Sequence, residues 1–92
     1  MIVNFYATLR QIVGKKSVEF SLDEGATVQQ LLSRIFNQYP EMERELLDEH
    51  GKMYGHVHVF INGRDVQFLQ DSMSSKISRD DTIDIFPAVG GG

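Results

Sequence analysis

The C-terminal end of the 92-residue sequence combines a rigid residue with a run of residues that lack side chains. Proline fixes one backbone φ angle, whereas glycine has the widest backbone freedom of any residue. Such a chain forms a thin, extendable thread that ends in a carboxylate, and no side chain obstructs its entry into a narrow channel. We therefore expect Gly92 to present a reachable carboxylate, and a glycine-rich end without function is the alternative. The residues of this predicted tail are Pro87, Ala88, Val89, Gly90, Gly91 and Gly92.

Histidines and carboxylates could also do chemistry, but neither set has a complete pattern. His56 and His58 lie two apart in a predicted strand, so both side chains project to one face. Two imidazoles do not close a metal site, and His50 lies across a loop, so we predict no metal site. Acid–base chemistry needs carboxylates that converge in an apolar pocket. The acidic residues of 41–49 are instead expected on a solvated helix face, where they could steer the domain toward a basic partner.

The composition excludes several classes of function. The sequence has no cysteine, which excludes disulfides, thiolate nucleophiles and cysteine-ligated metal centres, and which suits a reducing compartment. A formal charge of -4 is opposite to that of a protein that binds a phosphate backbone, so we expect no nucleic-acid partner. No apolar run approaches the ~20 residues that a membrane span needs, and the N-terminus lacks a signal-peptide pattern. We therefore expect a cytoplasmic protein that contacts no membrane.

The first part of the sequence predicts a β-hairpin. Residues 2–7 are rich in β-forming residues, and apolar residues alternate with polar ones again at 18–22. The intervening segment 9–13 is too short for an independent helix, and 14–16 reads as a flexible basic turn. Alternation in the first strand places on one face Val3, Phe5 and Ala7.

The middle of the sequence predicts a long amphipathic helix over residues 28–39. Thr27 and Gln30 have the spacing of a capping box, in which each side chain satisfies a backbone amide at the helix start. Apolar residues then recur at helical spacing, as expected for one buried stripe. Pro40 ends this helix, because proline disfavours helical geometry in the residue before it. Residues 41–50 predict a second, shorter helix whose inward-facing residues are Met42, Leu46 and Leu47.

The remaining sequence predicts three more strands. Residues 56–61 alternate strictly, and the following Asn62-Gly63 pair is typical of a tight hairpin turn with positive φ angles. The chain should therefore pair back over 64–68. A polar connector over 70–81, with Met73 and Ile77 turned inward, leads to a last strand at 82–86.

The order of these elements predicts an α+β domain in which one sheet packs against one main helix. The sequence also resembles the β-grasp family of ubiquitin-like sulfur carriers, in particular the small subunit of molybdopterin synthase. Residues 5–14 resemble the opening strand and turn of the family, and Thr27-Val28 its helix start. The segment Ile85 to Gly92 resembles its closing strand, proline and terminal glycines. The resemblance implies a mixed sheet of about five strands in a domain over 1–87, with a flexible tail over 88–92.

The resemblance also implies that the protein is a carrier and not itself an enzyme. A separate adenylating enzyme of the ubiquitin-activating type would use ATP to adenylate the Gly92 carboxylate, which then becomes a thiocarboxylate. The large catalytic subunit of molybdopterin synthase, or another sulfur acceptor, would receive the sulfur. No cofactor bound by the chain itself is implied. The alternatives are a ubiquitin-like modifier that joins Gly92 to target lysines, and a β-grasp binding module without covalent chemistry.

The face of the sheet away from the helix is the predicted partner-binding surface. Strands one, five and three are neighbours in a β-grasp sheet, so their outward residues should form one exposed aromatic cluster beside the root of the tail. Scattered surface aromatics without a function are the alternative. The predicted partner-binding residues are Tyr6, His58, Phe60 and Phe86, with Asp84 on the same face. The residues predicted to face the helix are Val3, Phe5, Val57, Val59, Ile61, Ile83 and Ile85.

Overall fold

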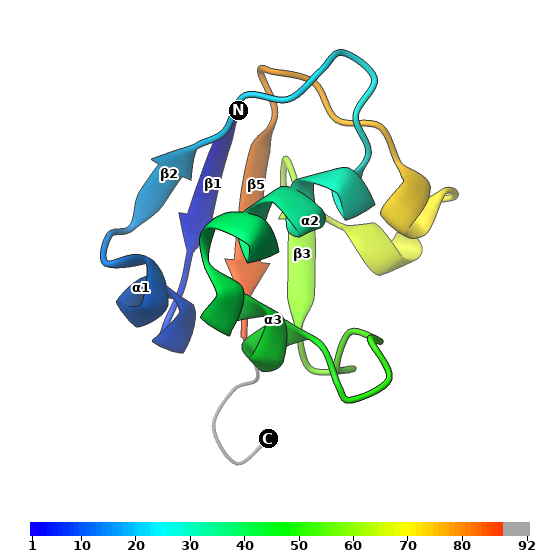
Figure 1. Ribbon diagram of the computed structural model, residues 1–92. Coiled ribbons are helices and arrows are strands. Elements are labelled where there is room, and N and C mark those ends of the chain that lie inside the picture. Colours follow the sequence, from blue (N-terminus) through cyan, green and yellow to red (C-terminus); the bar gives the residue numbers. More distant parts are fainter. Residues whose placement is uncertain (88–92) are drawn as a thin grey trace.

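A computed structural model describes residues 1–87, which form one sheet with helices across one of its faces (Figure 1). The sheet has five strands in the order β2-β1-β5-β3-β4 and contains both parallel and antiparallel pairs, so the predicted α+β fold with a mixed sheet is confirmed. The elements in chain order are β1 (Ile2–Phe5), α1 (Thr8–Val13), β2 (Ser17–Glu19), α2 (Val28–Gln38), α3 (Pro40–Leu46), β3 (His58–Ile61), β4 (Arg64–Asp65), the short 3-10 helices η1 (Val66–Phe68) and η2 (Ser72–Ser74), and β5 (Thr82–Phe86).

The pairing of the central strands brings three strand ends together. β1 and β5 are parallel neighbours, with Phe5 opposite Ile85. β3 is antiparallel to β5, with His58 opposite Phe86. The C-terminal ends of β1 and β5 therefore lie beside the N-terminal end of β3 (Figure 1). Pro87 follows β5 at this end of the sheet, so the root of the predicted tail is next to all three strands.

The predicted inner face of the sheet is confirmed. Side chains alternate between the two faces of a strand, and α2 lies across one of these faces (Figure 1). All seven predicted residues are buried: Val3, Phe5, Val57, Val59, Ile61, Ile83 and Ile85. The buried residues that α2 contributes are Val28, Leu31, Leu32 and Ile35.

The start of α2 follows the sequence prediction in detail. The Thr27 side chain accepts a hydrogen bond from the Gln30 amide, and the Gln30 side chain accepts one from the Thr27 amide. α2 ends at Gln38, and Pro40 occupies the first position of α3, where a missing amide costs nothing. No helix within residues 1–87 has the length and apolar character that a membrane crossing requires.

The first correction concerns residues 8–13, which form the helix α1 although the segment is too short to be stable alone. Tertiary packing supplies the missing stability, because Leu9 and Val13 are buried in the core. The helix ends at Gly14, whose φ of 84° is left-handed and whose amide donates to the Arg10 carbonyl. Gly14, the first residue of the predicted flexible turn, is therefore a defined helix cap.

The first two strands are shorter than predicted. β1 stops at Phe5, because Ala7 has a φ of 53° and turns the chain into α1. Ala7 is consequently exposed and does not share the inner face. β2 covers only 17–19, because its last partner in β1 is Ile2, which lies opposite Glu19. The next residue, Phe20, lies outside the strand, and its amide donates a hydrogen bond to the Met1 carbonyl.

The prediction of a strand over 64–68 is also wrong in part. β4 has only two residues, Arg64 and Asp65, after a turn in which Asn62 and Gly63 have φ values of 51° and 85° as predicted. The Asp65 carboxylate then accepts a hydrogen bond from the Gln67 amide and caps η1, so the chain leaves the sheet. A side-chain cap thus overrides the extended conformation.

Two further boundaries differ from prediction. β3 begins at His58, because the amide of Val57 donates to the Tyr54 carbonyl in a turn. The connector after η1 contains the short helix η2, which was not predicted. Ile77 is buried and Met73 packs half-buried against the core, as predicted.

Candidate docking face at the root of the tail

Three aromatic side chains from three different strands meet on the outer face of the sheet. The Tyr6 ring, just beyond β1, stacks on the Phe86 ring of β5 with centroids 4.2 Å apart and planes 13° apart. The Phe60 ring of β3 meets Phe86 edge-on at 5.4 Å, and the His58 ring lies 6.1 Å from Phe60. The structure therefore brings together all the residues that the sequence placed on this face, and Phe86 is at the centre.

These side chains are half-buried and not exposed as predicted. The difference has a simple cause: each ring covers part of its neighbour, because stacked and edge-to-face aromatic pairs pack closely. The group is a pre-packed platform with one side open to solvent. A partner that docks here would meet rings already fixed in place, which lowers the entropy cost of binding.

A carboxylate holds the Tyr6 end of this platform. Asp84 lies two residues before Phe86 on β5, and its Oδ1 accepts hydrogen bonds of 2.9 Å from both the Tyr6 hydroxyl and the Asn4 amide. Asn4 is opposite Asp84 in the parallel pair, and its own side-chain oxygen accepts from Ser17 of β2. The hydrogen bond to Asp84, with smaller effects of burial and of the Asp84 charge, raises the pKa of Tyr6 above its usual 10.0.

Arg10 of α1 lies at the same end of the platform, beside Tyr6. Its Nε donates to the Phe5 carbonyl at 3.1 Å, and its guanidinium carbon lies 5.8 Å from the centre of the Tyr6 ring. That distance is within the range of a cation–π contact. α1 therefore positions a cation beside the platform.

His58 closes the other end of the platform. Its Nδ1 lies 2.9 Å from Oδ2 of Asp65, the residue that also caps η1. The imidazole is therefore fixed by a carboxylate on β4 and by the neighbouring Phe60 ring. Its side chain keeps about two-fifths of its surface accessible at 39%. A partner could still reach it.

The tail itself lies mainly outside the described residues. Pro87 is the one tail residue that the structure describes, and it is buried directly after Phe86. Because proline has a fixed φ angle, a buried proline at this position gives the chain a defined exit from the fold. The other predicted tail residues, Ala88, Val89, Gly90, Gly91 and Gly92, are outside the described part of the chain.

The groups that sequence reasoning set aside do not join this site. His56 is exposed and stacks on Tyr54, away from the carboxylate that binds His58. Within residues 1–87, no three metal-binding side chains come together. The acidic side chains of Glu41, Glu43 and Glu45 are exposed on α3, as expected for a solvated helix face.

Sequence reasoning missed the polar residues that hold the aromatic platform: Asn4, Arg10 and Asp65. A signal existed for Asn4, because its position on the outer face of β1 puts it in register with Asp84 once β1 and β5 are known to be parallel neighbours. No sequence signal was available for Asp65, because its contact with His58 depends on the early end of β4.

Comparison with known proteins relates the whole chain to small β-grasp proteins. A sequence model described as the ThiS family matches residues 3–92. Small archaeal modifier protein 3 of Haloferax volcanii is 36% identical over 98% of this chain and 96% of that protein. The crystal structure of SAMP1 from Haloferax volcanii superposes with a TM-score of 0.85 and 26% identity, over 100% of this chain and 98% of that one. A putative molybdopterin converting factor, subunit 1, from Pyrococcus furiosus gives 0.76 and 28% over 96% and 95% of the two chains.

Proposed function

This chain belongs to the ThiS family of ubiquitin-like β-grasp proteins, and from that premise we propose that it is a carrier activated at Gly92. A separate ATP-dependent adenylating enzyme performs the activation. An oxygen of the Gly92 carboxylate attacks the α-phosphate of ATP and displaces pyrophosphate, which leaves an acyl-adenylate. Sulfide (HS⁻) from a sulfur donor then attacks the carbonyl carbon, displaces AMP and leaves a thiocarboxylate. The chain is the substrate in both steps and supplies no catalytic group of its own.

The observation that carries this proposal is the position of the aromatic platform relative to the tail. Phe86, at the centre of the platform, is followed immediately by Pro87 and then by the other five tail residues, 88–92. A chain extends at most ~3.3–3.6 Å per residue, so five residues reach about 17 Å from the fold. An enzyme that grips the platform can therefore hold the domain while the glycines enter its active site, and no bulky side chain blocks them.

The first fate that we propose for the activated tail is sulfur transfer in molybdopterin synthesis. In this role the chain is the small subunit of molybdopterin synthase, and the large catalytic subunit takes sulfur from Gly92 to a pterin precursor. The likeness to the putative molybdopterin converting factor, subunit 1, of Pyrococcus furiosus supports this choice. For these reactions we propose a cytoplasmic location, with ATP bound by the activating enzyme alone.

A second fate is favoured by a different observation. The 36% identity to small archaeal modifier protein 3 extends over nearly the entire length of both chains. In this role the acyl group of the adenylate is transferred to the amine of a target lysine, AMP leaves, and an isopeptide bond forms at Gly92. Both fates use the same tail and the same platform, so they differ only in the nucleophile that takes the activated carboxyl group.

Adenylation kinetics test the shared first step. The double substitution Phe60→Ser and Phe86→Ser removes two rings of the platform and should abolish ATP–pyrophosphate exchange with the activating enzyme. Ile2→Ser is the matched control, because Ile2 is an exposed apolar residue on the same face at the far end of β1. Circular dichroism verifies that both variants remain folded. Unchanged exchange kinetics in the folded double variant would show that the platform is not the docking surface.

Intact-mass measurement distinguishes the fates. Protein incubated with ATP, a sulfur source and cell extract should exchange one oxygen for one sulfur at Gly92 if it carries sulfur. Ladders of heavier conjugates, lost when Gly92 is deleted, indicate a modifier. No change in mass in either experiment contradicts activation of the tail and leaves a non-covalent binding module.

A further inference from the structure

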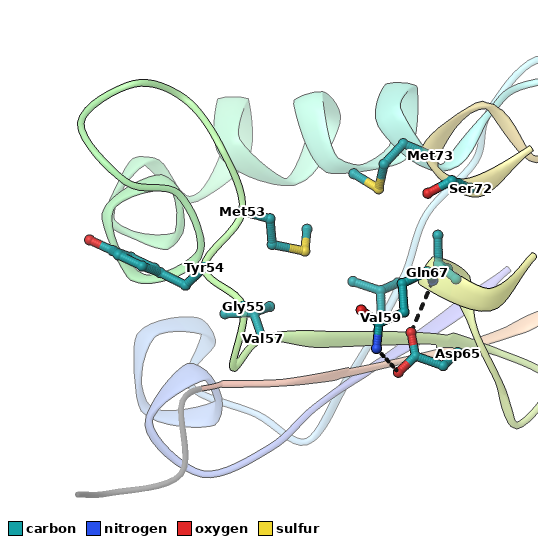
Figure 2. Close-up of a pocket in the computed structure, with 10 residues that line it drawn as sticks. Met53, Tyr54, Gly55, Val57, Val59, Asp65, Gln67, Ser72 and Met73 are labelled. Carbon is teal, nitrogen blue, oxygen red and sulfur yellow. Dashed lines mark hydrogen bonds between the residues drawn. The ribbon is translucent and has the colours of Figure 1, made fainter. Parts of the chain in front are cut away.

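Two apolar hollows lie next to each other on the helix side of the sheet. The first, of about 200 Å³, lies beside β3, and Figure 2 shows Met53 and Met73 approaching it from opposite sides. The second, of about 360 Å³, lies between α2 and the segment that follows α3. Met53 and Met73 line both hollows, which together are called the methionine groove. Its other main apolar residues are Leu32, Phe36, Leu47, Tyr54, Val57 and Val66.

The segment that carries Met53 is held in place by its own hydrogen bonds. Met53 pairs with Leu47 in an isolated β-bridge. The Asp48 Oδ1 accepts hydrogen bonds from the amides of His50 and Lys52, at 2.8 and 2.9 Å. The wall of the groove is therefore formed before a partner binds, which lowers the entropy cost of binding. The unbranched methionine side chains can still adapt to the apolar shape that enters.

Apolar surface remains in water around the methionine groove. Tyr54, which lines it, is 37% exposed. Phe68 is 81% exposed and directly follows Gln67, another lining residue. Large apolar side chains left in water next to a concave surface mark an interaction site.

The charges that line the groove are of one sign. Asp65 lines the first hollow and Glu43 the second, and among the described residues no lysine or arginine lines either one. Within residues 1–87 the Glu43 carboxylate has no ion-pair partner. The segment 41–53 carries five acidic residues against two basic ones. An occupant with basic residues beside its apolar side chains is therefore electrostatically matched.

The surroundings of the groove require an occupant that satisfies its own main chain. Val59 of β3 is only 2% exposed, and Val66 of η1, itself buried, covers the position that β4 leaves. An extended segment would find no free strand edge there. A helix pairs its amides and carbonyls internally. Its side chains one turn apart are ~5–6 Å from each other at Cβ, which suits two neighbouring hollows that share a wall.

We propose that the methionine groove binds an amphipathic helix of a partner protein that carries basic residues beside its apolar face. Two apolar side chains one helical turn apart enter the two hollows, and a flanking lysine or arginine faces Glu43 and Asp65. The groove lies on the side of the sheet that α2 covers, whereas the aromatic platform lies on the opposite face (Figure 1). The chain can therefore hold this helix while an activating enzyme grips the platform, and the site is independent of the tail.

Selection of helical peptides against the full-length chain tests this inference. A phage library of randomised single-helix peptides is selected on the immobilised protein, and the enriched peptides are synthesised. We expect apolar residues three or four apart with lysine or arginine beside them, and binding that shifts the backbone NMR signals of 51–54 and 72–73. A proline on the solvent face of the peptide, in its middle, should weaken binding about tenfold or more, because it breaks the helix while the protein remains unaltered.

Variants of the protein locate the binding surface. Glu43→Lys reverses an exposed charge and should weaken binding about fivefold or more, with the loss smaller at high salt. Glu19→Lys is the matched control, because Glu19 is an exposed glutamate on β2 at the far edge of the sheet, and it should bind within about twofold of the original protein. Tyr54→Ser should weaken binding severalfold, and the Phe60→Ser, Phe86→Ser variant should bind like the original protein.

Other outcomes overturn the inference. Enriched peptides that lack helical spacing, or that bind equally well with the central proline, exclude a helix as the occupant. Binding that is indifferent to Glu43→Lys and Tyr54→Ser excludes the groove, and shifts of the Tyr6 and Phe86 signals assign recognition to the aromatic platform. A selection that enriches no helix, or a sedimenting mass that rises with protein concentration through contacts of 51–54, excludes a separate partner. Because adenylation is measured separately, failure here leaves the proposed function intact.

Discussion

Removal of the Tyr6 hydroxyl tests whether the aromatic platform is held by Asp84. Tyr6→Phe deletes one hydrogen bond of 2.9 Å to the carboxylate and leaves the ring that stacks on Phe86. A hydrogen bond to a charged group contributes ~1.5–3 kcal/mol when buried, and partial exposure reduces this value. Asp84 also keeps its bond from Asn4. We therefore expect Tyr6→Phe to lower the free energy of unfolding by about 1 kcal/mol, and the melting temperature by ~4–8 °C.

The assay is urea denaturation of a double-mutant cycle with Asp84→Ala. If the hydroxyl acts through the carboxylate, Tyr6→Phe costs about 1 kcal/mol in the natural sequence and close to nothing when Asp84 is absent. Tyr39→Phe is the control, because the Tyr39 hydroxyl makes only a 3.3 Å contact with exposed Gln38. An equal cost of Tyr6→Phe in both backgrounds, within ~0.3 kcal/mol, would refute the coupling.

Three further predictions test the electrostatics and the helix ends. The pKa of Tyr6 is raised in the fold above 10.0, the pKa of an unfolded tyrosine. The contribution of Tyr6 to stability is therefore complete below pH 10.0 and is lost as the pH rises through the higher folded pKa. An NMR titration of the Tyr6 ring should show a lower pKa in Asp84→Ala than in the original protein. Gly14→Ala should destabilise by ~1 kcal/mol in urea through its φ of 84° alone, since an added Cβ meets nothing within 4 Å; no loss would contradict the left-handed cap. Thr27→Ala should cost ~1 kcal/mol by removing the capping box, and an unchanged denaturation midpoint would contradict that role.

The features that the sequence predicted correctly are those set by local chemistry and by a strict period. The capping box of Thr27 and Gln30 involves residues three apart, and the Asn62-Gly63 turn needs only its own two φ angles. The buried face of each strand follows from alternation, because side chains on a strand point to opposite faces in turn. Neither the length of the neighbouring strand nor the position of the core affects these patterns.

The features that it missed depend on contacts between distant residues. α1 exists because the core buries Leu9 and Val13, and a six-residue segment carries no independent sign of that burial. β2 ends where β1 no longer offers a partner. The platform of Tyr6, Phe60 and Phe86 could be predicted once the strand order was assumed, but its half-buried state could not, because the rings cover one another only at the observed distances.

Asp65 shows how one residue sets both the end of β4 and one end of the aromatic platform. Its Oδ1 accepts a hydrogen bond from the Gln67 amide and caps η1, so β4 ends after two residues. Its Oδ2 lies 2.9 Å from His58 and fixes that ring at the end of the aromatic platform. Without Asp65 the imidazole of His58 would lose its fixed orientation. One carboxylate thus sets the length of an edge strand and also fixes a residue of the aromatic platform, because its two oxygens bind groups on opposite sides.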